Sequence, residues 1–217
     1  SAPEMVQWID SHMLPLLLLI DTSGSMYKEI STINEAVQLM IESLQKDSHT
    51  KRIHLAIIVF GSGQGNVVEL HMPLTPIHEV EFTPMSVGGA TPMGAALDLA
   101  RTILEDVTLI PENSSKPIVI LFTDGEPTDN YTQSLKQFLD SDRGSQAQRI
   151  SIAFGQGANL ALVSQFASNG EGIYLDKGAL SENIARLFSQ AVDTVSDEIS
   201  EPVSAEQFEF PFDFQSW

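Results

Sequence analysis

The chain has 217 residues, enough for one domain with tails, and carries 29 acidic against 11 basic residues. The formal net charge of -18 disfavours nucleic acid and anionic membrane as partners. The chain contains no cysteine, which excludes disulfides, thiolate metal sites and cysteine nucleophiles, and suits a reducing cytoplasm. We therefore expect a cytoplasmic protein whose partners are proteins or divalent metal.

Residues 1–13 are predicted to be a leader outside the fold. They end in Asp10-Ser-His-Met13, which resembles an expression-vector remnant. The apolar run 13–20 lacks a basic flank, contains Pro15 and leads directly into Asp21, unlike a signal peptide. It is also much shorter than the roughly 20 residues of a membrane helix. We therefore predict a buried strand over 13–20.

The rest of the chain alternates between helical and strand patterns. Apolar residues at helical spacing predict helices over 30–44, 93–110, 131–139, 160–167 and 182–195. Short apolar runs predict buried strands over 53–60, 116–122, 148–154 and 172–175. Residues 67–74 alternate more, contain Pro73 and are followed by Pro76, as expected of an exposed edge strand. Strands separated by helices predict a mostly parallel sheet covered on both faces.

Three oxygen-rich stretches predict a metal site, at 21–25, 88–92 and 122–127. Asp21 and Asp124 each follow a predicted strand, at the sheet edge where doubly wound folds bind ligands. Ser23 and Ser25 stand two and four residues after Asp21, so a turn directs all three toward a point that Thr91 and Asp124 would close. An all-oxygen set with few carboxylates suits Mg2+, with Mn2+ or Ca2+ as alternatives.

Each stretch also has an ordinary structural explanation. Residues 21–25 have the composition of a hydrogen-bonded turn. Thr91 before Pro92 suits the N-cap of a helix, and Asp129 suits the N-cap of the helix that follows it. The combination of the three stretches, in this order, favours a metal site over three independent turns.

Residues 14–26, 88–97 and 118–128 resemble the von Willebrand factor type A family and its metal-ion-dependent adhesion site (MIDAS). The resemblance extends over residues 14–196. It implies a Rossmann-like, doubly wound α/β fold. This fold has a mostly parallel six-stranded sheet with one antiparallel edge strand, and helices on both faces.

The MIDAS pattern of that family is complete in this chain: Asp21, Ser23, Ser25, Thr91 and Asp124. The resemblance implies that the hydroxyls bind metal directly and that the aspartates bind it directly or through water. Two carboxylates balance a divalent ion and hydroxyls add no charge, so the ion can still attract an Asp or Glu of a partner. We therefore expect a non-enzymatic, metal-dependent protein-interaction module.

The three motifs are most similar to those of bacterial TerY-like proteins, which are associated with tellurium-resistance, kinase and phosphatase gene clusters. This implies a stress-response role with a kinase or phosphatase as partner. A structural assembly subunit with a loop-fixing metal is an alternative. A Mg2+-dependent phosphoryl-transfer enzyme is disfavoured, because the sequence has no phosphate-binding loop, no nucleophile elbow and no D-x-D motif.

Residues 197–217 are predicted to be an acidic, aromatic tail separate from the domain. One interpretation is a disordered solubilising tail. The other is a docking peptide for a partner or a second copy of the chain, through Phe208, Phe210, Phe212 and Phe214. Glu209 and Asp213 lie between these phenylalanines and are candidate occupants of the metal site.

Overall fold

The computed structural model describes residues 12–61, 67–176, 183–184 and 186. These residues form a six-stranded sheet in the order β3-β2-β1-β4-β5-β6. β3 is antiparallel to β2, and all other neighbours are parallel. The strands are β1 (Leu14–Asp21), β2 (Ile53–Phe60), β3 (Val68–Pro76), β4 (Ile118–Thr123), β5 (Gln148–Phe154) and β6 (Ile173–Leu175). The predicted α/β fold with one antiparallel edge strand is confirmed.

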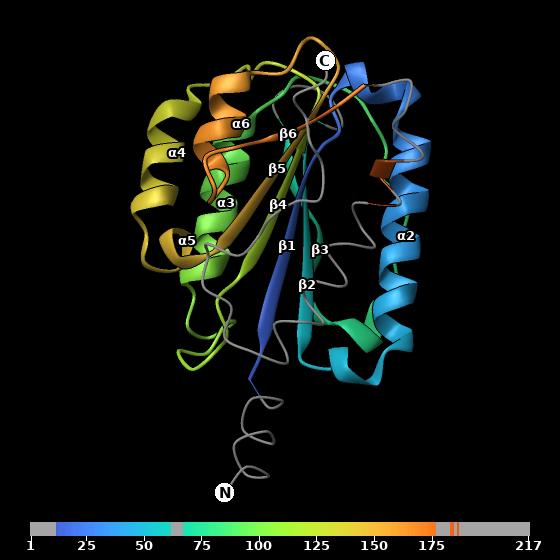
Figure 1. Cartoon of the computed structure of the whole chain (residues 1–217), viewed down its shortest axis with the longest axis vertical. Helices are drawn as coiled ribbons and strands as arrows, with labels where there is room; N and C mark the ends of the chain where they lie inside the picture. The colour runs from blue at the N-terminus through green and yellow to red at the C-terminus, as the bar shows by residue number, and fades with distance from the viewer. Residues whose placement is uncertain (1–11, 62–66, 177–182, 185, 187–217) are drawn as a thin grey trace, which may run out of the picture.

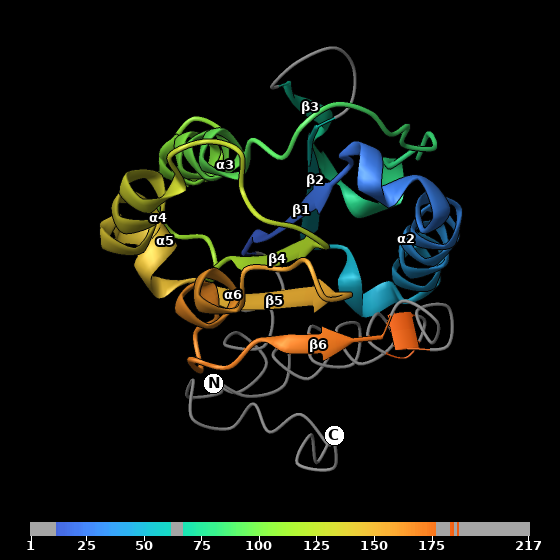
Figure 2. The same ribbon diagram turned by 90° about the horizontal axis from the view of Figure 1, so that it is seen from above.

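Helices cover both faces of the sheet. They are α2 (Ile30–Lys46), α3 (Met93–Glu105), α4 (Tyr131–Asp140), α5 (Asp142–Gln146) and α6 (Leu160–Phe166). Helix α2 lies on one face, and α3, α4, α5 and α6 lie on the other (Figure 1, Figure 2). Three short 3-10 turns complete the described elements: η1 (Gly24–Lys28), η2 (Ser48–Thr50) and η3 (Ile77–Glu79).

The central strand β1 is buried along its whole length. Leu16, Leu18 and Ile20 pack in the cluster that contains the apolar face of α2. Leu17 and Leu19 point the opposite way, into the cluster formed with α3, α4 and α6. Burial on both faces explains why this strand reads as an unbroken apolar run.

Two sequence predictions differ from the structure or lie outside it, and one helix was not predicted. Helix α3 ends at Glu105, not at 110, because the Asp106 carboxylate accepts hydrogen bonds from the Thr108 amide (2.8 Å) and hydroxyl (2.6 Å). Helix α5 was not predicted. Of the predicted helix 182–195, only 183, 184 and 186 belong to the described residues. In the described part of the chain, no helix combines the length and apolarity needed to cross a membrane.

The winding of the sheet reverses between β1 and β4. After β1 the chain passes through α2 to β2 on one side, and it reaches β4 on the other side only after β3 and α3. Ile20 pairs with Phe122, so Asp21 and the residues after β4 meet at the carboxyl edge of the sheet. The predicted site residues therefore follow two strands that flank the switch point.

Candidate metal centre

Asp21, the last residue of β1, is fully buried. Its Oδ1 accepts a hydrogen bond from the Ser23 amide at 2.9 Å, which turns the chain sharply after the strand. Its Oδ2 accepts the hydroxyl of Thr123, the last residue of β4, also at 2.9 Å. The Asp21 carboxylate is therefore held from its own loop and from the neighbouring strand.

The two serines connect this loop to Asp124. The Ser25 hydroxyl donates to Asp124 Oδ1 at 2.8 Å, and the Ser23 and Ser25 hydroxyl oxygens lie 3.0 Å apart. These contacts link the Ser23 and Ser25 hydroxyls and the Asp124 carboxylate. The structure thus brings Asp21, Ser23, Ser25 and Asp124 together at one point.

Backbone hydrogen bonds bring residues 88–92, the stretch that contains Thr91, to the same edge of the sheet. The Gly88 amide donates to the Thr22 carbonyl at 2.9 Å, and the Gly24 amide donates to the Gly89 carbonyl at 3.2 Å. Thr91 donates its amide to the Thr128 hydroxyl at 3.0 Å and accepts the Thr128 amide at 2.9 Å. The loops that carry Asp21, Thr91 and Asp124 are therefore joined pairwise.

The structure does not support the N-cap explanation for Thr91, and the predicted cap role of Asp129 was wrong. Pro92, not Thr91, is the N-cap of α3. The Asp129 carboxylate caps α3 rather than the helix that follows it, accepting the amides of Gly94 and Ala95 at 2.9 Å each. Asn130 precedes α4 as its N-cap. Asp129 thereby holds the loop after Asp124 against the helix that follows Thr91.

Burial dominates the electrostatics of the site. It raises the pKa of Asp21 above its ordinary value of 3.8, and the nearby negative charge of Asp124 adds to this effect. Hydrogen bonds from Ser23 and Thr123 act in the opposite direction without cancelling the rise. Ionisation of Asp21 therefore lowers the stability of the folded chain unless a positive charge lies nearby.

Replacing Asp21 by Asn is expected to stabilise the metal-free chain. Because the folded pKa of Asp21 is raised, the folded state binds this proton more tightly than the unfolded state, and stability is lost as pH rises from the ordinary pKa through the raised one. Each unit of the rise costs about 1.4 kcal/mol above both pKa values. The difference in unfolding free energy between Asp21→Asn and wild type, measured with urea and chelator, should grow as the pH rises above the ordinary pKa of 3.8. A difference that is constant with pH would contradict this assignment.

The oxygen set fits a divalent cation. Two carboxylates and two serine hydroxyls converge, and the buried residue Thr91 lies on a loop joined to theirs. Across the described residues, no three His, Cys, Asp or Glu side chains form a metal-binding group, so a cation here depends on hydroxyl oxygens. Hydroxyls, carboxylates and water are ligands that suit Mg2+ and similar hard ions.

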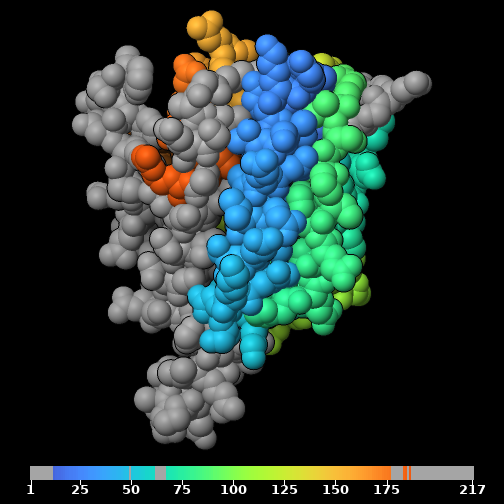
Figure 3. Space-filling view, turned by 90° about the vertical axis from the view of Figure 1, so that its right-hand side faces the viewer, coloured from blue at the N-terminus to red at the C-terminus, as the bar shows by residue number. Residues whose placement is uncertain are grey.

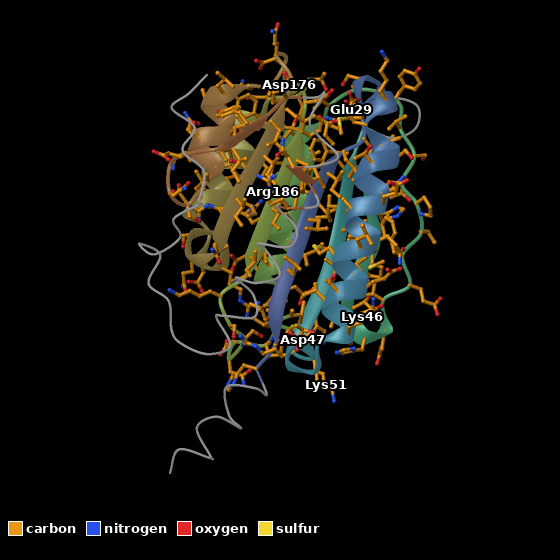
Figure 4. All side chains as sticks on the ribbon, turned by 45° about the vertical axis from the view of Figure 1, so that its right-hand side comes forward. Glu29, Lys46, Asp47, Lys51, Asp176 and Arg186 are labelled. Carbon is orange, nitrogen blue, oxygen red and sulfur yellow. The ribbon has the colours of Figure 1, made fainter. Side chains whose placement is uncertain are left out.

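Further acidic groups lie at this end of the molecule. Figure 4 shows Glu29, before α2, and Asp176, after β6, at the same end as the carboxyl edge of the sheet, whereas Lys46, Asp47 and Lys51 lie at the opposite end. Glu29 and Asp176 add negative charge at the end of the molecule that carries the candidate site, although Lys28 of η1 also lies near it.

Sequence reasoning missed several residues that hold the site. The Thr123 hydroxyl donates a hydrogen bond to the Asp21 carboxylate. The Thr128 hydroxyl accepts one from the Thr91 amide. The Asn159 amide donates to Glu126 at 2.8 Å, which ties the loop after β5 to the loop that carries Asp124. The polar run after the buried strand β4 was the available signal, but sequence spacing does not reveal partners so far away in the chain.

Solved structures share this fold at low sequence identity. Proximal thread matrix protein 1 from the mussel byssus matches with a TM-score of 0.62 and 17% identity, over 83% of this chain and 48% of that one. The ArnB paralog VWA2 from Sulfolobus acidocaldarius matches with a TM-score of 0.59 and 21% identity, over 82% and 45%. The pilus adhesin SpaC from Lactobacillus rhamnosus GG matches with a TM-score of 0.67 and 14% identity, over 87% and 30%. This chain thus spans less than half of each of these proteins.

One structure of the mussel protein is described as having a zinc-occupied MIDAS motif. No curated protein matches this chain. The model of the von Willebrand factor type A domain matches residues 16–190, most of the chain. With the fold described above, this match shows that the chain belongs to the von Willebrand factor type A domain family.

Proposed function

We propose that this chain is a non-enzymatic protein-interaction module that binds one divalent cation and uses it to capture an acidic residue of a partner. The ligands would be the complete MIDAS set, Asp21, Ser23, Ser25, Thr91 and Asp124, and the ion Mg2+, with Mn2+ or Ca2+ as alternatives. The observation that carries the proposal is the Ser23-Ser25-Asp124 hydrogen-bonded chain at the switch point of the sheet. Domains of this family commonly bind protein partners.

Charge explains why the partner should be acidic. Asp21 and Asp124 formally balance a divalent ion, while the hydroxyl ligands add no charge. The bound ion would therefore remain attractive to one more anionic oxygen. The zinc-occupied MIDAS of the mussel byssus protein supports a divalent ion at a site of this family.

The rim of the site adds apolar surface. Tyr27, two residues after Ser25 in η1, is 68% exposed, and Leu160, the first residue of α6, is 58% exposed. Helix η1 begins between Ser23 and Ser25, and the Asn159 side-chain amide donates to Glu126, two residues after Asp124. We infer a partner whose acidic residue has apolar neighbours.

The tail of this chain has that chemistry. Glu209 and Asp213 each lie between phenylalanines, in a segment outside the described residues that contains Phe208, Phe210, Phe212 and Phe214. A tethered ligand reaches a high effective concentration, whereas a separate acidic partner meets the long-range repulsion of a chain of net charge -18. We propose that this tail occupies the metal site or mediates self-association.

The biological setting that we propose for this module rests on the similarity of its three motifs to those of TerY-like proteins. It is a bacterial, cytoplasmic stress-response or tellurium-resistance system, with a kinase or phosphatase as partner. Within the chain we propose residues 14–196 as the domain, 1–13 as leader and 197–217 as tail.

Peptide binding tests the proposed capture of carboxylates. A labelled peptide of residues 207–217 is expected to bind the full chain in Mg2+, with affinity at least about tenfold weaker in chelator, for Asp124→Asn, or for a peptide carrying Glu209→Gln and Asp213→Asn. Fluorescence anisotropy measures each affinity. The Asp129→Asn chain is the matched control, because this neighbouring aspartate caps α3. If the chain's own tail competes, the same two substitutions in the chain should strengthen peptide binding.

The alternatives give different results. Mg2+ binding with no metal-dependent capture of the peptide or of proteins from lysate would favour a structural subunit with a loop-fixing metal. Phosphoester turnover that disappears in Asp21→Asn would instead identify an enzyme.

A further inference from the structure

The segment 80–90, which leads to Thr91, runs beside α2. It connects η3 to the loop before α3 and contains no helix or strand. Figure 3 shows this segment in green next to the blue helix, along much of its length. Val80 and Met85 are buried in the same cluster as the apolar face of α2.

Two amide side chains of α2, one near each end of the helix, form hydrogen bonds with the backbone of this segment and of η3 before it. Near the start of the helix, Asn34 accepts the Met85 amide at 2.8 Å and donates to the Met85 carbonyl at 3.0 Å. Near the end of the helix, Gln45 donates to the carbonyls of Ile77 (3.0 Å) and Val80 (2.9 Å). Each of these side chains forms two hydrogen bonds. Those of Asn34 hold Met85, which is nearer in the chain to Thr91 than the partners of Gln45 are.

Between Met85 and Thr91, Val87 packs against the core, and the backbone hydrogen bonds that this stretch forms with other described residues are those to the Asp21 loop. Gly88 bonds Thr22, and Gly89 bonds Gly24. The Asn34 contact therefore fixes the segment just before the loop that must deliver the Thr91 hydroxyl. Without it, the segment would have to be ordered when a ligand binds, at a cost in conformational entropy.

We propose that Asn34 is a positioning residue for the candidate metal site: through Met85 it sets the place of Thr91 and couples α2 to occupancy of the site. This inference rests on the proposed function, since it assigns Thr91 as a ligand. Residues that orient metal ligands without touching the metal typically change affinity by about 10- to 100-fold when replaced. A loss of Mg2+ affinity on the order of tenfold is therefore expected for Asn34→Ala.

The test compares Asn34→Ala with Gln45→Ala, which removes the same number of hydrogen bonds at the far end of the same helix. Calorimetric titration with Mg2+ is expected to show weaker binding for Asn34→Ala and wild-type affinity for Gln45→Ala. Both variants should lower the melting temperature in chelator to a similar degree. Asn34→Asp, which still accepts the Met85 amide, is expected to lie between Asn34→Ala and wild type, and replaces Asn34→Ala if that variant does not fold.

Hydrogen exchange separates this inference from the proposed function. In chelator, Asn34→Ala should speed amide exchange over residues 86–91, whereas Gln45→Ala should leave it unchanged. Equal Mg2+ affinity and equal exchange in the two variants would overturn the role of Asn34. Faster exchange in Asn34→Ala, together with a wild-type chain that binds no Mg2+, would keep the role of Asn34 in placing the loop and reject the metal site.

Discussion

Saturating Mg2+ is expected to raise the melting temperature of the wild-type chain by roughly 5–10 °C. A ligand at about 100 times its dissociation constant stabilises the folded state by about 2.7 kcal/mol, and each kcal/mol corresponds to about 2–4 °C for a chain of this size. The Asp124→Asn variant should lose this shift, because one of the two carboxylates that balance the ion is gone while the hydrogen bond from Ser25 can still form. Differential scanning calorimetry with Mg2+ and with chelator measures both shifts.

The matched control for this experiment is Asp129→Asn. Asp129 belongs to the same loop, but its carboxylate accepts the Gly94 and Ala95 amides of α3. This variant should be less stable with and without Mg2+ and keep the full shift. An equal shift in Asp124→Asn and Asp129→Asn would mean that the ion binds elsewhere.

Gly61→Ala is expected to cost on the order of 3 kcal/mol, or roughly 6–12 °C in melting temperature. Gly61 follows β2 with a φ of 110°, which side-chain-bearing residues rarely adopt. A Cβ atom there would lie 2.2 Å from the Ala90 carbonyl oxygen and 2.8 Å from the Ser23 nitrogen. The substitution would push apart the loops that carry Ser23 and Thr91, so the shift with Mg2+ should fall as well. Urea unfolding and calorimetry measure the two effects.

Two other glycines separate backbone strain from the clash. Gly170 has a φ of 73° but nothing within 4 Å of an added Cβ, so Gly170→Ala reports strain alone. Gly125 follows Asp124 and also has open space at this position, without a left-handed φ. Both Gly170→Ala and Gly125→Ala should keep the shift with Mg2+. A Gly61→Ala variant as stable as Gly170→Ala would show that the two loops are not packed as described.

The sequence predicted the sheet and its edge because those features depend on local patterns. Leu14 to Ile20 is apolar at every position except Pro15, and burial on both faces requires such a run. The partly polar sequence of β3 matches its place at the edge, where Met72 is buried and the other residues are partly or fully exposed. Asp21 and Asp124 could be placed near each other because both follow strands of one mostly parallel sheet.

The features that the sequence did not reveal depend on distant partners. Asp129 caps α3 instead of α4, since the loop after β4 folds back toward Gly94. Nothing in the sequence around Asn34 indicates that its side chain holds Met85, 51 residues away. The end of α3 was misplaced because the apolar spacing continues to Ile110, although Asp106 forms a competing local turn.

In the proposed metal centre, five oxygen-bearing side chains from three loops hold one divalent ion. A crystal structure grown with Mn2+, with anomalous scattering recorded at the manganese edge, tests this site most directly. One strong peak is expected within bonding distance of the Ser23, Ser25 and Thr91 hydroxyl oxygens, next to Asp21 and Asp124. No peak at this position in crystals soaked to saturation, or a peak only at another part of the surface, would contradict it.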